Sequence, residues 1–218
     1  MSCGKDNISL LKGKLEKDTS LLLLDKPLED ISIDLDEGEE LNLTIVDFSS
    51  CSYDVKLIFN LQEIAILNIY IASLCLNDSM KILKVDVNHQ KKETTSFVSF
   101  NGVNLSSHPF RFLGSSYIEE NALKSKTRQE GKITNLIKEA KSEVSPALYI
   151  KNNDVEASHG AALGAYNEDH LFYLTSRGIS LSEAKKLITY GSLYPTILKL
   201  KDENLINLAK YRLEKENI

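Results

Sequence analysis

The sequence predicts a mainly β protein with helices at its C-terminal end, and three observations support this. Short runs of aliphatic and β-branched residues, separated by polar turns, fill the chain as far as about Asn152. Several runs alternate between apolar and polar residues, as strands with one buried face do. Beyond Asn152, apolar residues recur at helical spacing between recognisable caps. With 218 residues, 42% of them hydrophobic and 26% charged, the chain fits a globular protein of one or two domains.

The expected strands are half-buried. Every second residue is apolar from Ile31 to Leu35 and again from Leu41 to Ile45, which places one face on a core and the other in water. Repeated short strands are typical of a sandwich, a barrel or a β-solenoid, and alternation alone does not choose among the three. The expected strands include 20–24, 31–35, 41–48, 55–60, 64–71, 82–87 and 95–100.

Residues 133–144 fit two structures. Leu136, Ile137 and Ala140 lie at helical spacing before Pro146, so the local pattern favours a helix. The alternative is a strand over 133–137, a polar turn over 138–145 and a second strand over 147–150. The family resemblance described below favours the two strands.

In the C-terminal part, residues typical of helix caps mark where helices are expected to begin and end. Asn167 is expected to cap a helix that ends at Gly178, where glycine accepts a left-handed backbone. Ser180 and Glu183 have the spacing of a capping box for a second helix. The expected helical segments are 167–176, a segment from Ser180 that ends at Gly191, 193–200, and one that begins at Asp202 as its cap.

Composition and motifs exclude several classes of function. The chain has 26 Lys and Arg against 31 Asp and Glu, so no overall positive field attracts nucleic acid. It contains no Walker A, dinucleotide-binding or HExxH motif, so we expect no nucleotide or zinc enzyme. The apolar stretch 64–76 is too short to cross a membrane and the first residues do not resemble a signal peptide, so we expect a cytoplasmic protein without a membrane partner.

The three cysteines do not form a recognisable site. Cys3, Cys51 and Cys75 are odd in number and far apart, unlike a disulfide framework or a metal-binding CxxC pair. Cys51 and Cys75 lie beside strand-like runs, and we expect both to be core residues.

The strongest motif follows the expected strands. Residues 153–164 read Asn-Asp-Val-Glu-Ala-Ser-His-Gly-Ala-Ala-Leu-Gly, and residues 171–179 read Leu-Phe-Tyr-Leu-Thr-Ser-Arg-Gly-Ile. In order and spacing they resemble the signature of the SufB/SufD family of iron–sulfur cluster assembly proteins, whose SufD branch reads D-V-x-C-S-H-G-A-x-x-G and then L-F-Y-L-x-S-R-G-I. The chain is therefore identified as a SufD-like, short member. Weaker matches lie upstream at His89, at 95–96, at 112–114, at Gln129 and at 147–150.

The resemblance implies a right-handed parallel β-helix core followed by a small C-terminal helical domain. The implied division is an N-terminal segment over 1–19, the β-helix core over 20–153 and the helical domain over 154–218. The chain is shorter than typical SufD proteins, so it is expected to lack their N-terminal helical domain and some β-helix turns.

The resemblance also implies partners. Family members pair through their β-helix cores, so we expect a SufB-like subunit or a second copy of this chain as one partner. A SufC-like ABC ATPase is expected to bind the C-terminal helices. The assembled complex builds a transient iron–sulfur cluster, and the chain alone is expected to bind no cofactor stably.

His159 is the residue that the resemblance singles out. The SufD histidine at this position is implicated in cluster assembly at the dimer interface, and neutral imidazole is a suitable iron ligand. Ala157 stands where the SufD signature has cysteine, so a cluster at His159 needs cysteine from a partner chain. The alternative is that Ser158, His159 and Gly160 shape a turn between sheet and helix, with Gly160 and Gly164 serving backbone geometry.

Two further groups of residues are candidates. His89 is expected to be a second polar residue at the interface. Phe172, Tyr173, Arg177 and Gly178 are the candidates in the domain that docks the ATPase.

Three functions remain open, and the motif favours the first. In the first, which the resemblance implies, the chain is expected to be a scaffold subunit of a SufBCD-type complex and not an enzyme, because ATP hydrolysis belongs to the partner. In the second, it is a structural or interaction subunit of that complex without cluster ligands of its own. The third is a β-solenoid enzyme that acts on carbohydrate through paired carboxylates.

Overall fold

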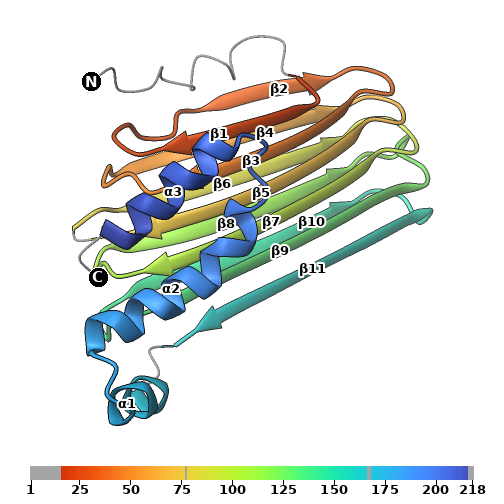
Figure 1. Cartoon of the computed structure of the whole chain (residues 1–218). Helices are drawn as coiled ribbons and strands as arrows, with labels where there is room; N and C mark the ends of the chain where they lie inside the picture. The colour runs from red at the N-terminus through yellow and green to blue at the C-terminus, as the bar shows by residue number, and fades with distance from the viewer. Residues whose placement is uncertain (1–15, 77, 166–167, 216–218) are drawn as a thin grey trace.

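Eleven strands form two parallel sheets in the computed structural model, which describes residues 16–76, 78–165 and 168–215. The strands are β1 (Asp18–Leu23), β2 (Ile31–Leu35), β3 (Glu40–Asp47), β4 (Tyr53–Leu61), β5 (Ile66–Cys75), β6 (Lys81–His89), β7 (Thr95–Asn104), β8 (Pro109–Ile118), β9 (Ser125–Asn135), β10 (Lys141–Ile150) and β11 (Val155–Gly164). One sheet has the order β1-β3-β5-β7-β9-β11 and the other the order β10-β8-β6-β4-β2. Since successive strands alternate between two parallel sheets, the chain winds as a β-solenoid, with β1 and β2 at one end and β10 and β11 at the other (Figure 1).

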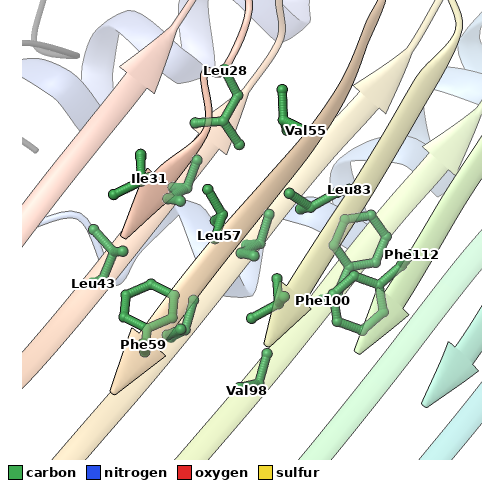
Figure 2. Close-up of a cluster of buried hydrophobic side chains, with 14 of the residues drawn as sticks. Leu28, Ile31, Leu43, Val55, Leu57, Phe59, Leu83, Val98, Phe100 and Phe112 are labelled. Atoms are coloured by element: carbon green, nitrogen blue, oxygen red, sulfur yellow. The ribbon is translucent and has the colours of Figure 1, made fainter. Parts of the chain in front are cut away.

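The space between the two sheets, here called the lumen, holds the main hydrophobic core. Alternate residues of each strand point into it, so the sequence alternation marks lumen-facing and outward-facing positions. Val55 and Phe59 of β4 are two such buried residues. Phe100 and Phe112 come from opposite sheets and stack across the lumen with ring centroids 4.5 Å apart (Figure 2). The parallel β-solenoid that the family resemblance implies is therefore confirmed.

Three helices follow the strands: α1 (Glu168–Ser176), α2 (Leu181–Ile197) and α3 (Glu203–Lys215). α2 lies across the outer face of the sheet formed by the odd-numbered strands, where it contacts β3, β5 and β7 (Figure 1). Leu193 and Ile197 of α2 and Leu213 of α3 join Val46 and Leu74 of the sheet in a second buried cluster. None of the described helices is long and apolar enough to span a membrane.

The two-strand structure for residues 133–144 is correct, but its turn lies elsewhere. β9 ends at Asn135 and β10 begins at Lys141, so the turn covers 136–140 instead of 138–145. Pro146, expected to stop an element, lies inside β10. Residues 155–164, which we expected to begin the helical domain, form β11, so the strands continue beyond residue 153. The N-terminal segment 1–19 lies mostly outside the described residues, and β1 begins within it at Asp18.

The expected break at Gly191 is wrong. α2 continues through Gly191 and Pro195, and the separate helix expected over 193–200 is largely the second half of α2. Leu193 and Ile197 are fully buried against the sheet. Their burial offsets the low helix propensity of glycine and proline.

Three expected helix boundaries are confirmed. Gly178, after α1, has a φ of 87°. Ser180 and Glu183 form both hydrogen bonds of a capping box at the start of α2. Asp202 Oδ1 accepts a backbone hydrogen bond of 2.8 Å from the first turn of α3. Asn167, the expected cap of α1, lies outside the described residues.

Replacing Ser180 with alanine is expected to lower the free energy of unfolding by about 1 kcal/mol, because an amide of the first turn of α2 loses its acceptor. Chemical denaturation followed by circular dichroism measures this loss. Ser182→Ala is the matched control, since Ser182 is exposed within the same turn. Equal losses in the two variants would contradict a specific role of the cap.

Candidate functional site

The end of the solenoid formed by β10 and β11, here called the open end, is the least buried part of the β core. Each of these strands has one neighbour in its sheet among the described residues. Leu163 and Ile150 are 52% and 44% exposed, although the residues that they pair with, Ile133 and Ile118, are fully buried. The open end therefore presents a cross-section of the hydrophobic lumen.

His159 lies in the middle of β11 and is exposed at the open end. It pairs in register with Gln129 of β9, which points into the lumen, so His159 occupies a lumen-facing position. The alternative of a turn over Ser158, His159 and Gly160 is wrong, because all three are strand residues. Gly160 and Gly164 do not have positive φ values. A Cβ at Gly160 would meet nothing within 4 Å, so neither space nor backbone conformation requires glycine there.

The backbone of β11 has free hydrogen-bonding groups at the open end. The N–H of Lys126 donates to the carbonyl of Thr94, the residue just before β7, at 2.8 Å. The backbone groups of Lys126 therefore point toward β7, and those of its two neighbours in β9 point toward β11. In a parallel ladder both backbone groups of a residue point to the same side, and successive residues alternate. Consequently the even-numbered residues of β11 bond to β9. The residues whose N–H and C=O point to the free edge are Val155, Ala157, His159, Ala161 and Leu163.

The free edge of β10 is less complete. The N–H of Lys151 donates to the carbonyl of Ile118 on β8 at 3.0 Å, and alternation from this residue places Pro146 on the free-edge side. Proline is tolerated there because no bond to β8 is lost. The edge of β10 thus lacks one donor near its middle, whereas β11 can pair along its whole length.

The open end has an imidazole but no thiol among its described residues. Ala157 occupies the position two residues before His159 where the SufD signature has cysteine. Cys75 is fully buried, as expected for a core residue, and burial raises the pKa of its thiol. Cys51 is half-buried in the segment before β4, so it is not a core residue. Within the described part of the chain, no three His, Cys, Asp or Glu side chains are grouped to hold a metal ion.

His89, expected at the interface, is fully buried in the lumen. Its Nδ1 lies 2.7 Å from Thr94 Oγ1 and its Nε2 lies 2.9 Å from Ser96 Oγ. Both ring nitrogens therefore have partners, and His89 cannot contact a partner chain directly. Sequence reasoning missed this location because polar residues occupy lumen positions that the alternation rule assigns to apolar ones.

Burial lowers the pKa of His89 from 6.5 to about 4, because the lumen disfavours the charged imidazolium. Between these two pH values the unfolded chain binds a proton that the folded chain does not. We therefore expect this histidine to reduce the free energy of unfolding by about 3 kcal/mol in total as the pH falls from 6.5 to 4. Above pH 6.5 the imidazole is neutral in both the folded and the unfolded chain, so it costs no stability, and below pH 4 it is charged in both, so the loss grows no further.

Urea denaturation across this pH range, in the wild type and in His89→Gln, measures that contribution. The variant has no titrating group at this position, so its stability is expected to fall less steeply with acid. Parallel curves for the two proteins would contradict the assignment.

The candidates for ATPase docking lie on α1 and just after it. Leu171 is buried, whereas Phe172 and Tyr173 are 73% and 56% exposed. The guanidinium carbon of Arg177 lies 5.1 Å from the ring centroid of Tyr173. Gly178 ends the helix in the left-handed conformation. This part of the helical domain thus presents exposed aromatic rings beside a cation.

A groove of about 560 Å³ lies next to Gly178, between α2 and α3. Apolar side chains line much of it, including Ile179, Leu187 and Leu213. The hydroxyl of Thr189, on its wall, is buried and has no hydrogen-bond partner. The apolar lining suits an apolar side chain, since the hydroxyl of Thr189 is not exposed in the groove.

Comparison with known proteins gives one matching family. The family model described as "SUF system FeS cluster assembly, SufBD core domain" matches residues 29–192 of the 218. This match extends from β2 through β11 and into α2, so it includes the open end.

Curated relatives match shorter segments. The iron–sulfur cluster assembly protein SufD of Bacillus subtilis is 34% identical over 117 residues, which are 54% of this chain and 27% of that protein. SufD of Escherichia coli is 34% identical over 98 residues, or 43% of this chain and 22% of that protein. A SufBD family protein of Pyrococcus horikoshii is 37% identical over 71 residues, or 33% of this chain and 16% of that protein. The matched segments therefore cover only a minor part of each relative.

Proposed function

Because this chain belongs to the SufBD core family of the SUF iron–sulfur cluster assembly system, we propose that it is a scaffold subunit of a SufBCD-type complex. It pairs with another chain through the open end and docks an ABC-type ATPase through its helices. The observation that carries the proposal is the position of His159, the central residue of the SufD-like motif, on a free strand edge at the end of the solenoid.

The open end suits pairing by strand addition. β11 offers an unbroken row of backbone donors and acceptors, and its lumen-facing side chains are apolar apart from His159. A partner strand there completes the hydrogen bonds of the edge and covers Leu163 and Ile150, which are now exposed. The partner is a SufB-like subunit or a second copy of this chain.

Iron and sulfide are the cargo of this interface. His159 supplies an imidazole that can ligate iron, and the partner supplies thiolate, because Ala157 has replaced the cysteine of the motif. That requirement favours a SufB-like partner over a second copy, since the described cysteines of this chain lie away from the open end.

The helical domain supplies the contact with the ATPase. The exposed rings of Phe172 and Tyr173 provide apolar contact area, and the groove beside Gly178 can receive a side chain of the partner. ATP hydrolysis belongs to that partner. This chain acts as the scaffold through which movement of the ATPase reaches the open end.

A second candidate function is a structural subunit without ligands. The presence of Ala157 favours it, because the subunit has lost the thiolate of the motif. In this case the chain completes the complex and recruits the ATPase, and its partner holds the cluster alone.

The variant His159→Ala separates the two candidates. The complex is isolated anaerobically and supplied with iron and sulfide, and cluster formation is followed by visible absorption. For the scaffold role we expect a several-fold loss of cluster at an unchanged subunit ratio. His108→Ala is the matched control, since His108 is an exposed histidine in the loop before β8. An unchanged cluster yield in His159→Ala would favour the structural subunit.

A further inference from the structure

Polar side chains in the lumen form one continuous hydrogen-bonded chain. His89 Nε2 lies 2.9 Å from Ser96 Oγ, and Ser96 Oγ lies 2.8 Å from Thr127 Oγ1. Thr127 Oγ1 lies 2.9 Å from Ser116 Oγ. All four side chains are buried, and they come from β6, β7, β9 and β8. The chain therefore links both sheets across the lumen.

Gln129 ends this chain on the side of the open end. Its amide oxygen accepts from the N–H of Ser116 at 2.9 Å, and its amide nitrogen donates to the carbonyl of Gly114 at 3.1 Å, in the orientation that satisfies both atoms. Gly114 makes room for this arrangement, because a Cβ there would lie 2.5 Å from the Gln129 amide. The amide is thus clamped between its own sheet and β8.

The amide also sets the direction of the whole chain. The carbonyl oxygen of Gln129 can only accept, so the hydroxyl of Ser116 donates to it and each earlier hydroxyl donates to the next. His89 must then donate from Nε2, and its Nδ1 accepts from Thr94 Oγ1 at 2.7 Å. One arrangement of protons satisfies every member, which holds the side chains in a single conformation.

The end of this hydrogen-bonded chain lies directly beneath the residues of β11. Thr127 pairs in register with Ala157, and Gln129 pairs with His159. All four residues occupy lumen-facing positions. The amide of Gln129 therefore belongs to the layer of side chains directly below the imidazole of His159. Below Gln129, the next residue in the same row is Val98, and the lumen there is apolar.

We propose that Gln129 is a positioning residue for His159. Held by Ser116 and Gly114, its amide closes the lumen beneath the imidazole with a fixed polar floor. The imidazole therefore stays at the free edge, where a partner chain or iron can reach it. Without the amide, the space over Val98 opens and the imidazole turns into it. This role rests on the proposed function of His159.

The test uses the isolated full chain with Gln129→Ala. Two quantities are measured: the rate at which diethyl pyrocarbonate modifies His159, by mass spectrometry, and the tautomer of His89, by ¹⁵N NMR. We expect several-fold slower modification of His159 in the variant. In the wild type we expect His89 to be protonated at Nε2, and in the variant a mixture of tautomers, because the terminal acceptor has gone.

Val98→Ala is the matched control, because it removes side-chain volume from the lumen one strand away and leaves the amide of Gln129 clamped. Its His159 is expected to react as in the wild type. Ser116→Ala loosens the clamp without creating a large cavity and is expected to slow the reaction in the same direction, so the test does not depend on one variant folding. An unchanged rate in Gln129→Ala, or equal slowing in Val98→Ala, would overturn the positioning role.

These measurements need neither a partner nor iron, so they are independent of the proposed function. If His159 is displaced as expected but His159→Ala assembles clusters normally, the positioning stands and the scaffold role of His159 fails. If His159 is not displaced, the positioning fails whatever the cluster assay gives.

Discussion

Replacing Ala161 with proline is expected to weaken pairing of this chain with its partner by about 100-fold while leaving the isolated chain folded. The N–H of Ala161 points to the free edge of β11 and bonds to nothing in its own sheet. Proline removes that donor and places its ring against the incoming strand, so a backbone acceptor of the partner is left unpaired. Sedimentation of the mixed subunits measures the association, and chemical denaturation measures the fold.

Ala162→Pro is the matched control for this prediction. Both alanines are exposed in the middle of β11, but the N–H of Ala162 faces β9. Proline at 162 therefore breaks a bond within the sheet and is expected to lower the free energy of unfolding by about 1–3 kcal/mol. Pro146 of β10, which already lies at a free-edge position, shows that the fold accepts proline there. Wild-type association by Ala161→Pro would show that pairing does not use the edge of β11.

Replacing Asp47 with leucine is expected to lower the free energy of unfolding by about 3–5 kcal/mol, because the buried charge of Lys81 loses its counter-ion. Lys81 Nζ lies 2.7 Å from Asp47 Oδ2, and both side chains are almost completely buried. The same carboxylate accepts from the hydroxyls of Tyr53 at 2.7 Å and Ser73 at 3.1 Å. A loss of this size is a large fraction of the total stability of a typical domain.

The double variant Asp47→Leu with Lys81→Met tests the cause. Removing both charges leaves no buried ion, so most of the lost stability should return, although the hydroxyls of Ser49, Tyr53 and Ser73 and the N–H of Ser49 lose their acceptor. Urea denaturation of the wild type, both single variants and the double variant gives the coupling between the two side chains. A double variant less stable than Asp47→Leu would show that the ion pair does not explain the effect.

Much of the fold could be predicted from the sequence, because half-buried strands and helix caps leave local patterns. The alternation from Ile31 to Leu35 and the capping box at Ser180 both correspond to observed elements. The β-solenoid itself could not be predicted from alternation, since a sandwich gives the same period. The resemblance of residues 153–164 to a family motif made that choice.

The wrongly predicted boundaries of helices and strands have a common physical cause. Contacts between distant parts of the chain outweigh the preference of the local sequence. Gly191 is expected to end a helix, but burial of Ile197 on the sheet keeps α2 continuous. The sequence places the residues of β11 in the helical domain, because small residues such as Ala161 have little strand propensity.

The candidate site was predicted in part. The motif led to His159, and the structure places it on a free edge. His89 and Gln129 also resembled family positions, but the sequence could not show that they belong to one hydrogen-bonded chain in the lumen. These two residues are 40 positions apart in the sequence, and only the winding of the solenoid links them through the side chains between them.

The measurement that tests the central claim most directly is an anaerobic co-purification. The tagged chain is produced with the SufB-like and SufC-like proteins of its own source, and the subunit ratio and the visible spectrum are recorded. We predict a stoichiometric complex that acquires charge-transfer absorption with iron and sulfide and that is lost in Ala161→Pro. Recovery of the tagged chain without either protein would contradict the claim that it is a scaffold subunit.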